Sequence, residues 1–189
     1  MRADPEVVVE DRPNVYRPSD DSYLLLGAVS VSPGDRFLEV GAGAGLLALH
    51  AAGIAKAVAT DVIPEAVELL RMNARRNRVA LEVVRTDLMA GLRGPFDVVA
   101  FNPPYLAGEP TDAPERAWQG GEAGSEVAIR FLRDLPRILA VDGRAYLLLS
   151  RENAPARELA ESSFRVKVKT SKDLFFERLE VLELRQGLE

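Results

Sequence analysis

Residues 36–45 read RFLEVGAGAG, and this stretch decides the fold. Its first half is an apolar run typical of a buried strand, and Gly41, Gly43 and Gly45 follow that run directly. A helix-like apolar stretch, residues 46–52, comes next. Glycines at such a junction permit a sharp turn and a close approach of the backbone to a ligand. The spacing is G-x-G-x-G and differs from the dinucleotide fingerprint G-x-G-x-x-G, so the stretch predicts a ligand-binding turn of another kind.

Acidic residues end the next two predicted strands. Asp61 closes the apolar run 56–61, about twenty residues after the glycines, where a carboxylate can bind a ribose diol. Asp87 follows the run 81–86, where an adenine amino group can be met. A single acid at a strand end is usually a helix cap or a turn residue. The joint pattern therefore indicates a nucleoside-containing ligand, whereas neither acid does so alone.

A fourth apolar run, residues 96–101, leads into Asn102-Pro103-Pro104-Tyr105. The prolines fix φ and stiffen the loop, which can then aim the Asn102 side-chain oxygen and the Pro103 carbonyl at one point. This arrangement suits a planar NH2 group at the carboxyl end of a parallel strand. Amides and aromatic amines are poor nucleophiles, so such a site works by positioning and by hydrogen bonds to developing charge. The structural alternative is a tight loop capped by an aromatic residue.

Apolar strands alternate with helical patterns along the whole chain, which predicts an α/β fold with a mostly parallel sheet covered by helices on both faces. The final two strands are expected to form an antiparallel pair. One domain is expected over residues 1–189; the first 14 residues are polar with two prolines, a composition that allows disorder. The long loop 103–121, which contains Trp118, is expected to be functional. The predicted helices cover residues 19–30, 44–53, 64–77, 124–140 and 153–162, and the predicted strands cover residues 36–40, 56–60, 81–85, 96–101, 144–149, 164–170 and 175–185.

Composition excludes several classes of function. The chain has no cysteine, which rules out a disulfide framework and a cysteine zinc site, and its one histidine, His50, rules out a histidine triad. We interpret His50 as a surface or helix-end residue. The net charge of −5 argues against a dedicated nucleic-acid binder. No run is long enough to span a membrane and no signal peptide is evident, so a cytoplasmic location without membrane partners is expected.

The chain resembles the class I S-adenosylmethionine-dependent methyltransferases, and more narrowly the short HemK-like protein-glutamine methyltransferases of archaea and eukaryotes. The Asn-Pro-Pro-Tyr (NPPY) tetrad is shared with DNA adenine methyltransferases, whereas residues 15–26 and 117–124 are more specific to this family. The resemblance implies a Rossmann-like seven-stranded sheet in the order 3-2-1-4-5-7-6. It rests on residues 15–26, 38–45, 61–66, 87–88, 101–105 and 117–124.

The resemblance also implies the site. Glu39 and the glycine turn are expected at the methionine and sugar of S-adenosylmethionine, Asp61 at the ribose, and Ser22 over the methionine end. The adenine amine is expected to meet Asp87, with Leu88 donating a backbone N–H. The implied catalytic residues are Asn102, Pro103, Pro104 and Tyr105, and the implied cofactor-binding residues are Ser22, Glu39, Gly41, Gly43, Asp61, Val62, Asp87, Leu88 and Asn102.

The implied reaction is methylation of the glutamine amide in the Gly-Gly-Gln motif of a class I translation release factor. No metal is expected to take part. Short members of the family often bind a small zinc-binding activator subunit through an edge strand, here residues 81–84. Three alternatives stay open: a nucleic-acid adenine or guanine N-methyltransferase, a protein-lysine methyltransferase, and an inactive protein that only binds the cofactor. Nucleic acid is not expected as the primary partner.

Overall fold

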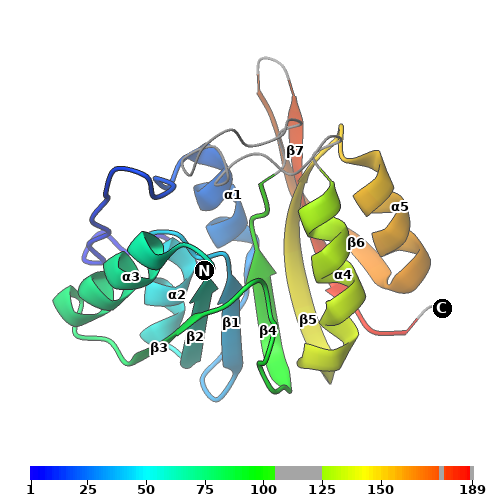
Figure 1. Ribbon diagram of the computed structural model, residues 1–189. Helices are drawn as coiled ribbons and strands as arrows, with labels where there is room; N and C mark the ends of the chain where they lie inside the picture. The colour runs from blue at the N-terminus through cyan, green and yellow to red at the C-terminus, as the bar shows by residue number, and fades with distance from the viewer. Residues whose placement is uncertain (105–124, 175–176, 188–189) are drawn as a thin grey trace.

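Seven strands form one central sheet in the computed structural model, which describes residues 1–104, 125–174 and 177–187 (Figure 1). The spatial order is β3-β2-β1-β4-β5-β7-β6, as the resemblance implied. The first five strands run parallel, and β7 runs antiparallel to both β5 and β6. The strands are β1 (Arg36–Val40), β2 (Lys56–Asp61), β3 (Leu81–Arg85), β4 (Phe96–Phe101), β5 (Leu139–Ser150), β6 (Arg165–Asp173) and β7 (Arg178–Arg185).

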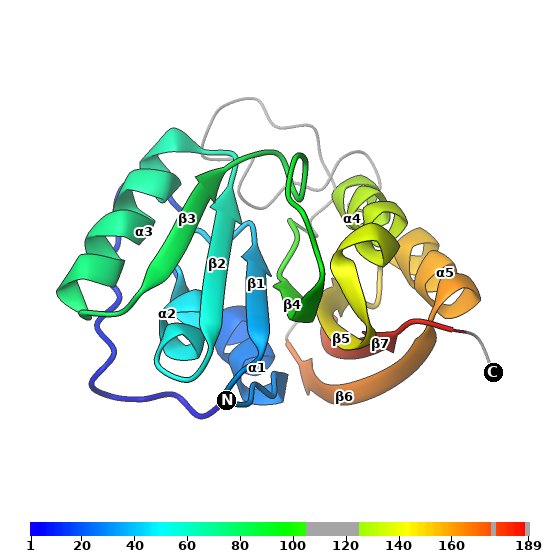
Figure 2. The same ribbon diagram turned by 90° about the horizontal axis from the view of Figure 1, so that it is seen from below.

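Helices cover both faces of the sheet, as Figures 1 and 2 show. On one face lie α1 (Asp20–Ala28), α2 (Leu46–Ala52) and α3 (Pro64–Arg76), and on the other lie α4 (Glu126–Ile138) and α5 (Ala154–Ser163). None of these helices has the length and apolar character that a bilayer crossing would need within the described residues.

Strand β4 illustrates why the parallel strands read as unbroken apolar runs. Val98 and Ala100 pack with the side chains of α1 and α2, whereas Val99 and Phe101 pack with those of α4 and α5. Successive side chains of a strand point to opposite faces, and here both faces are buried. Because β1 to β5 are parallel, their carboxyl ends meet at one edge of the sheet, and this edge carries the candidate site.

Strand β5 begins earlier than the sequence predicts, at Leu139 instead of residue 144. Asp142 and Gly143 look like a turn in the sequence, yet the strand runs through them. The pairing with β4 shifts register between Phe96 and Val98, which accommodates this irregular start. A side chain at Gly143 would meet the Ala140 carbonyl oxygen at 2.9 Å, so this close backbone approach requires glycine.

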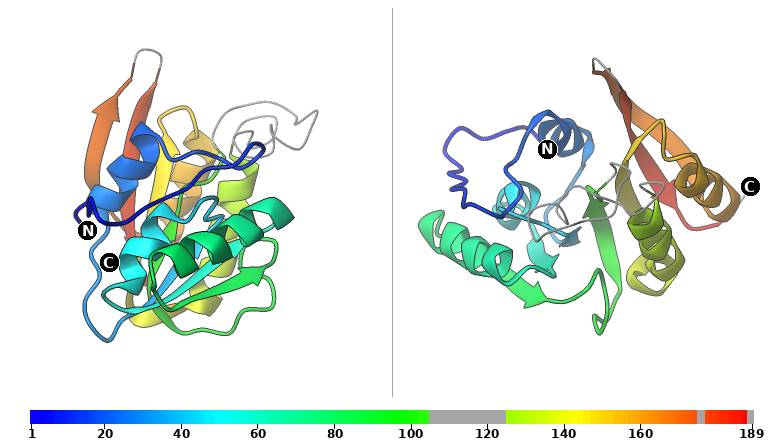
Figure 3. Two further views of the ribbon diagram at one scale, coloured as in Figure 1. Left: turned by 90° about the vertical axis from the view of Figure 1, so that its left-hand side faces the viewer. Right: turned by 45° about the horizontal axis from the view of Figure 1, so that its top comes forward.

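The N-terminal segment covers His50 and changes our interpretation of that residue. His50 does lie in the last turn of α2, but it is only 8% exposed, so the surface interpretation was wrong. Its Nδ1 lies 2.7 Å from the Leu46 carbonyl oxygen, and its Nε2 accepts a hydrogen bond of 3.0 Å from the Asp4 backbone N–H. Residues 1–14, whose composition allowed disorder, pass beside α2 and α3 in this structure (Figure 3).

Candidate active site

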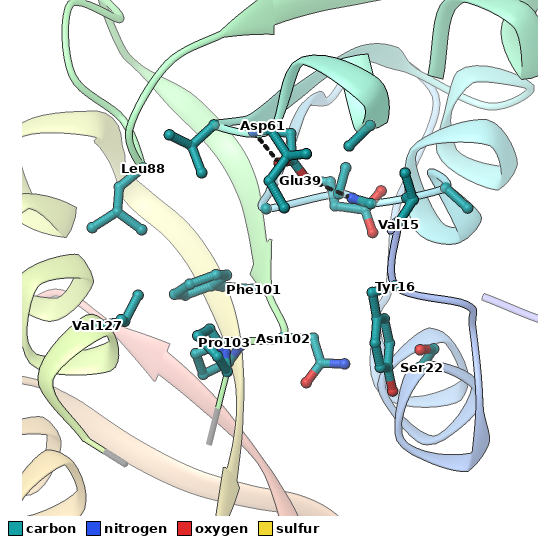
Figure 4. Close-up of a pocket in the computed structure, with 18 of the residues that line it drawn as sticks. Val15, Tyr16, Ser22, Glu39, Asp61, Leu88, Phe101, Asn102, Pro103 and Val127 are labelled. Carbon is teal, nitrogen blue, oxygen red and sulfur yellow. Dashed lines mark hydrogen bonds between the residues drawn. The ribbon is translucent and has the colours of Figure 1, made fainter. Parts of the chain in front are cut away.

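A cavity of about 540 Å³ opens at the carboxyl ends of β1, β2 and β4, between α1 and α4 (Figure 4). This volume falls in the range of small-molecule sites. The predicted site residues that line it are Ser22, Glu39, Gly41, Gly43, Asp61, Val62, Asp87, Leu88, Asn102, Pro103 and Pro104. Tyr105, Trp118 and the loop 106–121 lie outside the described residues. The structure thus brings these predicted residues to one cavity, while their roles toward ligands stay predictions.

The glycine turn, residues 41–45, joins β1 to α2 in a left-handed conformation. Gly43 and Gly45 have φ of 54° and 89°, which side-chain-bearing residues rarely adopt. A side chain at Gly45 would also lie 2.5 Å from the Leu70 side chain of α3. Without side chains at Gly41, Gly43 and Gly45, the turn can bring its backbone close to a ligand in the cavity.

Glu39 lies beneath the first turn of α2. Its Oε2 accepts a 2.6 Å hydrogen bond from the Ala48 N–H, and only 7% of the residue is exposed. Burial raises the pKa of Glu39 to about 8, because the hydrogen bonds from α2 offset desolvation only in part and the neighbouring Asp61 adds to the rise. Glu39 therefore anchors the helix that follows the glycine turn while it also lines the cavity.

Asp61 holds the glycine turn from the next strand. Its Oδ2 accepts from the Gly43 N–H at 2.8 Å, and its Oδ1 accepts from the Ile63 N–H at 2.9 Å. Burial raises the pKa of Asp61, and these backbone hydrogen bonds oppose the rise. A carboxylate can accept about four hydrogen bonds, so Asp61 can still receive ribose hydroxyls. Its neighbour Val62 is exposed at the cavity rim.

Asp87 is held by a residue that the sequence analysis missed. Arg130 of α4 donates from Nη2 to Asp87 Oδ2 at 2.5 Å, and both side chains are 54% exposed. Arg130 lines the same cavity. The following residue, Leu88, has a positive φ of 51°, and its carbonyl accepts from Thr60 Oγ1 at 3.1 Å. The sequence carries no signal for the ion pair, since Arg130 looks like a solvated residue on an amphipathic helix.

Asn102 presents a buried acceptor to the cavity. Its Nδ2 donates to Asp21 Oδ2 at 3.1 Å, while its Oδ1 is buried without a hydrogen-bond partner among the described residues. Figure 4 shows its side chain between Pro103 and Tyr16. Buried polar atoms are nearly always paired, so an orphan acceptor at a cavity needs an explanation, and a ligand is one.

Asp21 is a second residue that the sequence analysis did not single out, and it directly precedes Ser22, which was expected over the methionine end of the cofactor. Tyr16 directs its hydroxyl at both Asp21 oxygens, at 2.7 and 2.6 Å, and the Ser22 N–H and hydroxyl both donate to Oδ1. Burial would raise the pKa of Asp21, but the hydrogen bonds from Tyr16, Asn102 and Ser19 outweigh it and lower the pKa. Asp21 is therefore a buried carboxylate that stays ionised at neutral pH.

Tyr16 completes this network. Burial, and then the Asp21 carboxylate, raises the pKa of the Tyr16 hydroxyl well above its usual range, so Tyr16 acts as a neutral donor. Because an ionised carboxylate only accepts hydrogen bonds, the Asn102 amide must turn its NH2 toward Asp21 and its oxygen away. The described residues contain no cluster of histidine, aspartate and glutamate suited to a metal ion.

Comparison with known proteins agrees with this geometry. The family model for the methyltransferase small domain matches residues 9–176. A Methanocaldococcus jannaschii protein assigned by name as a protein N5-glutamine methyltransferase is 35% identical over 182 residues, covering 90% of this chain and 91% of its own. The mouse methyltransferase HEMK2 is 37% identical over 159 residues, covering 75% of this chain and 74% of its own.

Among solved structures, the E. cuniculi Mtq2–Trm112 complex, described as responsible for methylation of the termination factor eRF1, aligns with a TM-score of 0.74 and 25% identity. The alignment covers 92% of this chain and 99% of that one. The fold, the cavity at the strand ends and these relatives agree, so the chain belongs to the methyltransferase small domain family and, within it, to the HemK-like protein-glutamine methyltransferases.

Proposed function

We propose that the protein transfers a methyl group from S-adenosylmethionine to the side-chain amide nitrogen of a glutamine, and that this glutamine belongs to the Gly-Gly-Gln motif of a class I translation release factor. The observation that carries the proposal is the orphan Asn102 Oδ1. It is a buried acceptor, aimed away from a carboxylate that holds the other end of the same amide.

The chemical groups that line the cavity suit S-adenosylmethionine. The carboxylates of Asp61 and Asp87 line the cavity at two neighbouring strand ends, where a ribose diol and an adenine amine each need an acceptor. The left-handed glycine turn leaves room for the cofactor next to the backbone. We assign Asp61 to the ribose and Asp87 to the adenine amine, with Glu39 supporting the turn. The bound cofactor supplies a methyl group already activated on a sulfonium.

Asn102 and the loop after it would hold the substrate amide. Asn102 Oδ1 accepts one N–H of the glutamine NH2, and the Pro103 carbonyl accepts the other. As the new N–C bond forms, the bond from the methyl carbon to the sulfonium sulfur would break and the sulfur would leave as a neutral thioether. The amide nitrogen would gain positive charge, and both hydrogen bonds would strengthen. The nitrogen then releases one proton to water. Asn102 and Pro103 thus act by orienting the lone pair and by stabilising charge, and no strong base is required. Tyr105 is expected to pack on the flat face of the amide.

A release factor as the substrate is supported by a relative. The Mtq2–Trm112 complex is described as methylating eRF1, and its methyltransferase resembles this chain over nearly its whole length. The two glycines before the target glutamine would let the substrate backbone approach the cavity closely.

Strand β3 is the proposed site for an activator subunit. Within the described part of the chain β3 pairs only with β2, so its other edge has no neighbouring strand, and only the Arg71 side chain donates to the Val83 carbonyl there, at 3.4 Å. Leu81 and Val83 are only partly buried. Such an edge invites pairing with another chain. The relative in the Mtq2–Trm112 complex has a partner subunit, and we propose a small zinc-binding subunit here. A Val83→Lys protein that still binds the subunit as tightly as the unmodified protein would argue against this edge.

The test of function measures transfer of labelled methyl from S-adenosylmethionine. Release factors with Gly-Gly-Gln and Gly-Gly-Ala tips are compared, with structured RNA and DNA in parallel and with the activator subunit added. Label on the Gln form alone supports the proposal. Label on nucleic acid, or equal label on both tips, would instead indicate a base or a lysine methyltransferase.

A further inference from the structure

Two asparagines, Asn73 of α3 and Asn77 at the C-cap of that helix, hold the N-terminal strap, which we define as residues 4–17. Asn77 Oδ1 accepts from the Val8 N–H at 2.8 Å, and its Nδ2 donates to the Val8 carbonyl at 2.7 Å. Asn73 Oδ1 accepts from the Glu10 N–H at 3.2 Å, and its Nδ2 donates to the Glu10 carbonyl at 3.1 Å. Each amide thus pairs with both backbone groups of one strap residue, as a neighbouring β-strand would.

Asn73 differs from Asn77 in one contact. Its Nδ2 also donates to the Ala44 carbonyl at 2.9 Å, and Ala44 belongs to the glycine turn. The NH2 group has two hydrogens, so both donations occur together. Asn73 is 0% exposed, whereas the second donation of Asn77 goes back to the Asn73 carbonyl of its own helix, at 2.8 Å. One buried amide therefore joins the strap to the glycine turn.

The C-terminal end of the strap contacts the glycine turn as well. Val15 packs in one cluster with Ala44, Ala66 and Leu69, and a side chain at Gly43 would lie 3.4 Å from the Tyr16 carbonyl oxygen. Val15 and Tyr16 line the cavity, and Tyr16 holds Asp21, which holds Asn102. The strap is thus continuous with the network that orients the candidate catalytic amide.

Ion pairs add little to this attachment. Arg76 meets Glu10 and Arg12 meets Glu68, both at 3.2 Å, but all four side chains are at least 38% exposed. Exposed pairs of this kind contribute little because water and salt screen them. The specific polar attachment of the strap therefore comes from the two asparagine amides and from the hydrogen bond that the Asp4 N–H donates to His50.

We propose that Asn73 is a positioning residue that couples closure of the strap to occupancy of the glycine turn by S-adenosylmethionine. This inference rests on the proposed placing of the cofactor. A cofactor bound against the turn fixes the Ala44 carbonyl, which fixes the Asn73 amide and with it Glu10 of the strap. Coupling of this kind is reciprocal, so a strap released from Asn73 weakens cofactor binding by the same factor.

The experiment compares Asn73→Ala with Asn77→Ala as the matched control. Both variants remove a strap attachment, but only the first removes the link to Ala44. Hydrogen exchange of the strap and of the glycine turn is followed with and without S-adenosylmethionine, and the cofactor Kd is measured by calorimetry. Thermal unfolding without cofactor shows whether each variant folds, and Asn73→Ser replaces Asn73→Ala if the latter does not.

In the unmodified protein, cofactor should slow exchange in both the strap and the turn. Both variants should exchange faster in the strap, but only the Asn73 variant should lose the cofactor-dependent protection there and show a Kd raised about tenfold. An Asn73 variant that keeps this protection, or an Asn77 variant with the same loss of affinity, would overturn the coupling. Absence of turn protection in the unmodified protein would instead refute the placing of the cofactor.

Discussion

Asp21→Asn should reverse the orientation of the Asn102 amide. The new side chain has one oxygen and one NH2 group, whereas Asp21 has two acceptor oxygens. The NH2 group takes the place of the present Oδ2, which lies 3.1 Å from Asn102 Nδ2. Two donors cannot face each other, so Asn102 turns its oxygen toward residue 21 and presents its NH2 to the substrate. The acceptor that should bind the glutamine N–H is then lost.

The magnitude follows from the bond that the carboxylate makes. A hydrogen bond to a charged group contributes about 1.5–3 kcal/mol, and that difference corresponds to a loss of about 10- to 150-fold in kcat/KM. Cofactor affinity should change much less, because Asp21 acts on Asn102 and does not hold the glycine turn. Single-turnover methyl transfer and calorimetric cofactor binding separate the two effects.

The control is Asp20→Asn. Asp20 is the preceding residue, its side chain is 70% exposed, and it pairs only with Lys172 at the surface among the contacts we describe, at 2.7 Å. This variant should keep its activity within about twofold, as expected for an exposed pair. If Asp21→Asn stays within about threefold of the unmodified protein, Asp21 does not orient Asn102 and the reasoning fails.

Four further changes test the other assignments. Asn102→Ala should lower kcat about 10²- to 10³-fold in methyl-transfer assays while cofactor still binds, and retained turnover would remove it from catalysis. Asp61→Ala should raise the cofactor Kd at least about tenfold by calorimetry, and unchanged binding would refute the ribose assignment. Arg130→Ala should raise that Kd only about two- to fivefold, because its pair with Asp87 is exposed, and the rise should vanish for a cofactor analogue without the adenine amine. The pKa of Glu39 is raised in the folded state from 4.5 to about 8, so between these pH values the folded protein binds one proton more than the unfolded chain. The free energy of unfolding should therefore fall as the pH rises through this range, by at most about 1.4 kcal/mol per pH unit. Glu39→Gln should flatten this slope in denaturant titrations, and an unchanged slope would contradict the raised pKa of Glu39.

The central parallel strands were predictable because most of their residues are buried on both faces. A run such as residues 96–101 has apolar side chains toward both helix layers, which leaves an unbroken apolar signature. The order of the strands is a long-range property that no local pattern contains, and only the resemblance implied it. The early start of β5 was missed because Asp142 and Gly143 favour a turn locally, and pairing with β4 overrides that preference.

The site residues at the strand ends were predictable because parallel strands bring their carboxyl ends together. The sequence pattern does not show which of these side chains contact one another. The hydrogen bond from Asn102 to Asp21 spans 81 positions, and the Arg130–Asp87 pair spans 43. Asn73 looks like a polar residue on the outside of a helix, yet the strap buries it completely. Each of these residues acquires its partner only when segments distant in sequence pack together.

The charge state of Asp21 bears on which nitrogen the site can methylate. A lysine must lose its proton before it can attack, and an ionised carboxylate nearby raises the pKa of an ammonium group and opposes that loss. The hydrogen bonds from Tyr16 and Asn102 keep Asp21 ionised despite its burial, so the penalty would persist at neutral pH. A glutamine amide carries no such proton and releases one only after the methyl group has arrived. The hydrogen bonds among Tyr16, Asp21 and Asn102 therefore favour a neutral NH2 substrate over lysine. They do not distinguish a glutamine amide from a nucleobase amine, so that selectivity must come from the protein surface that binds the rest of the substrate.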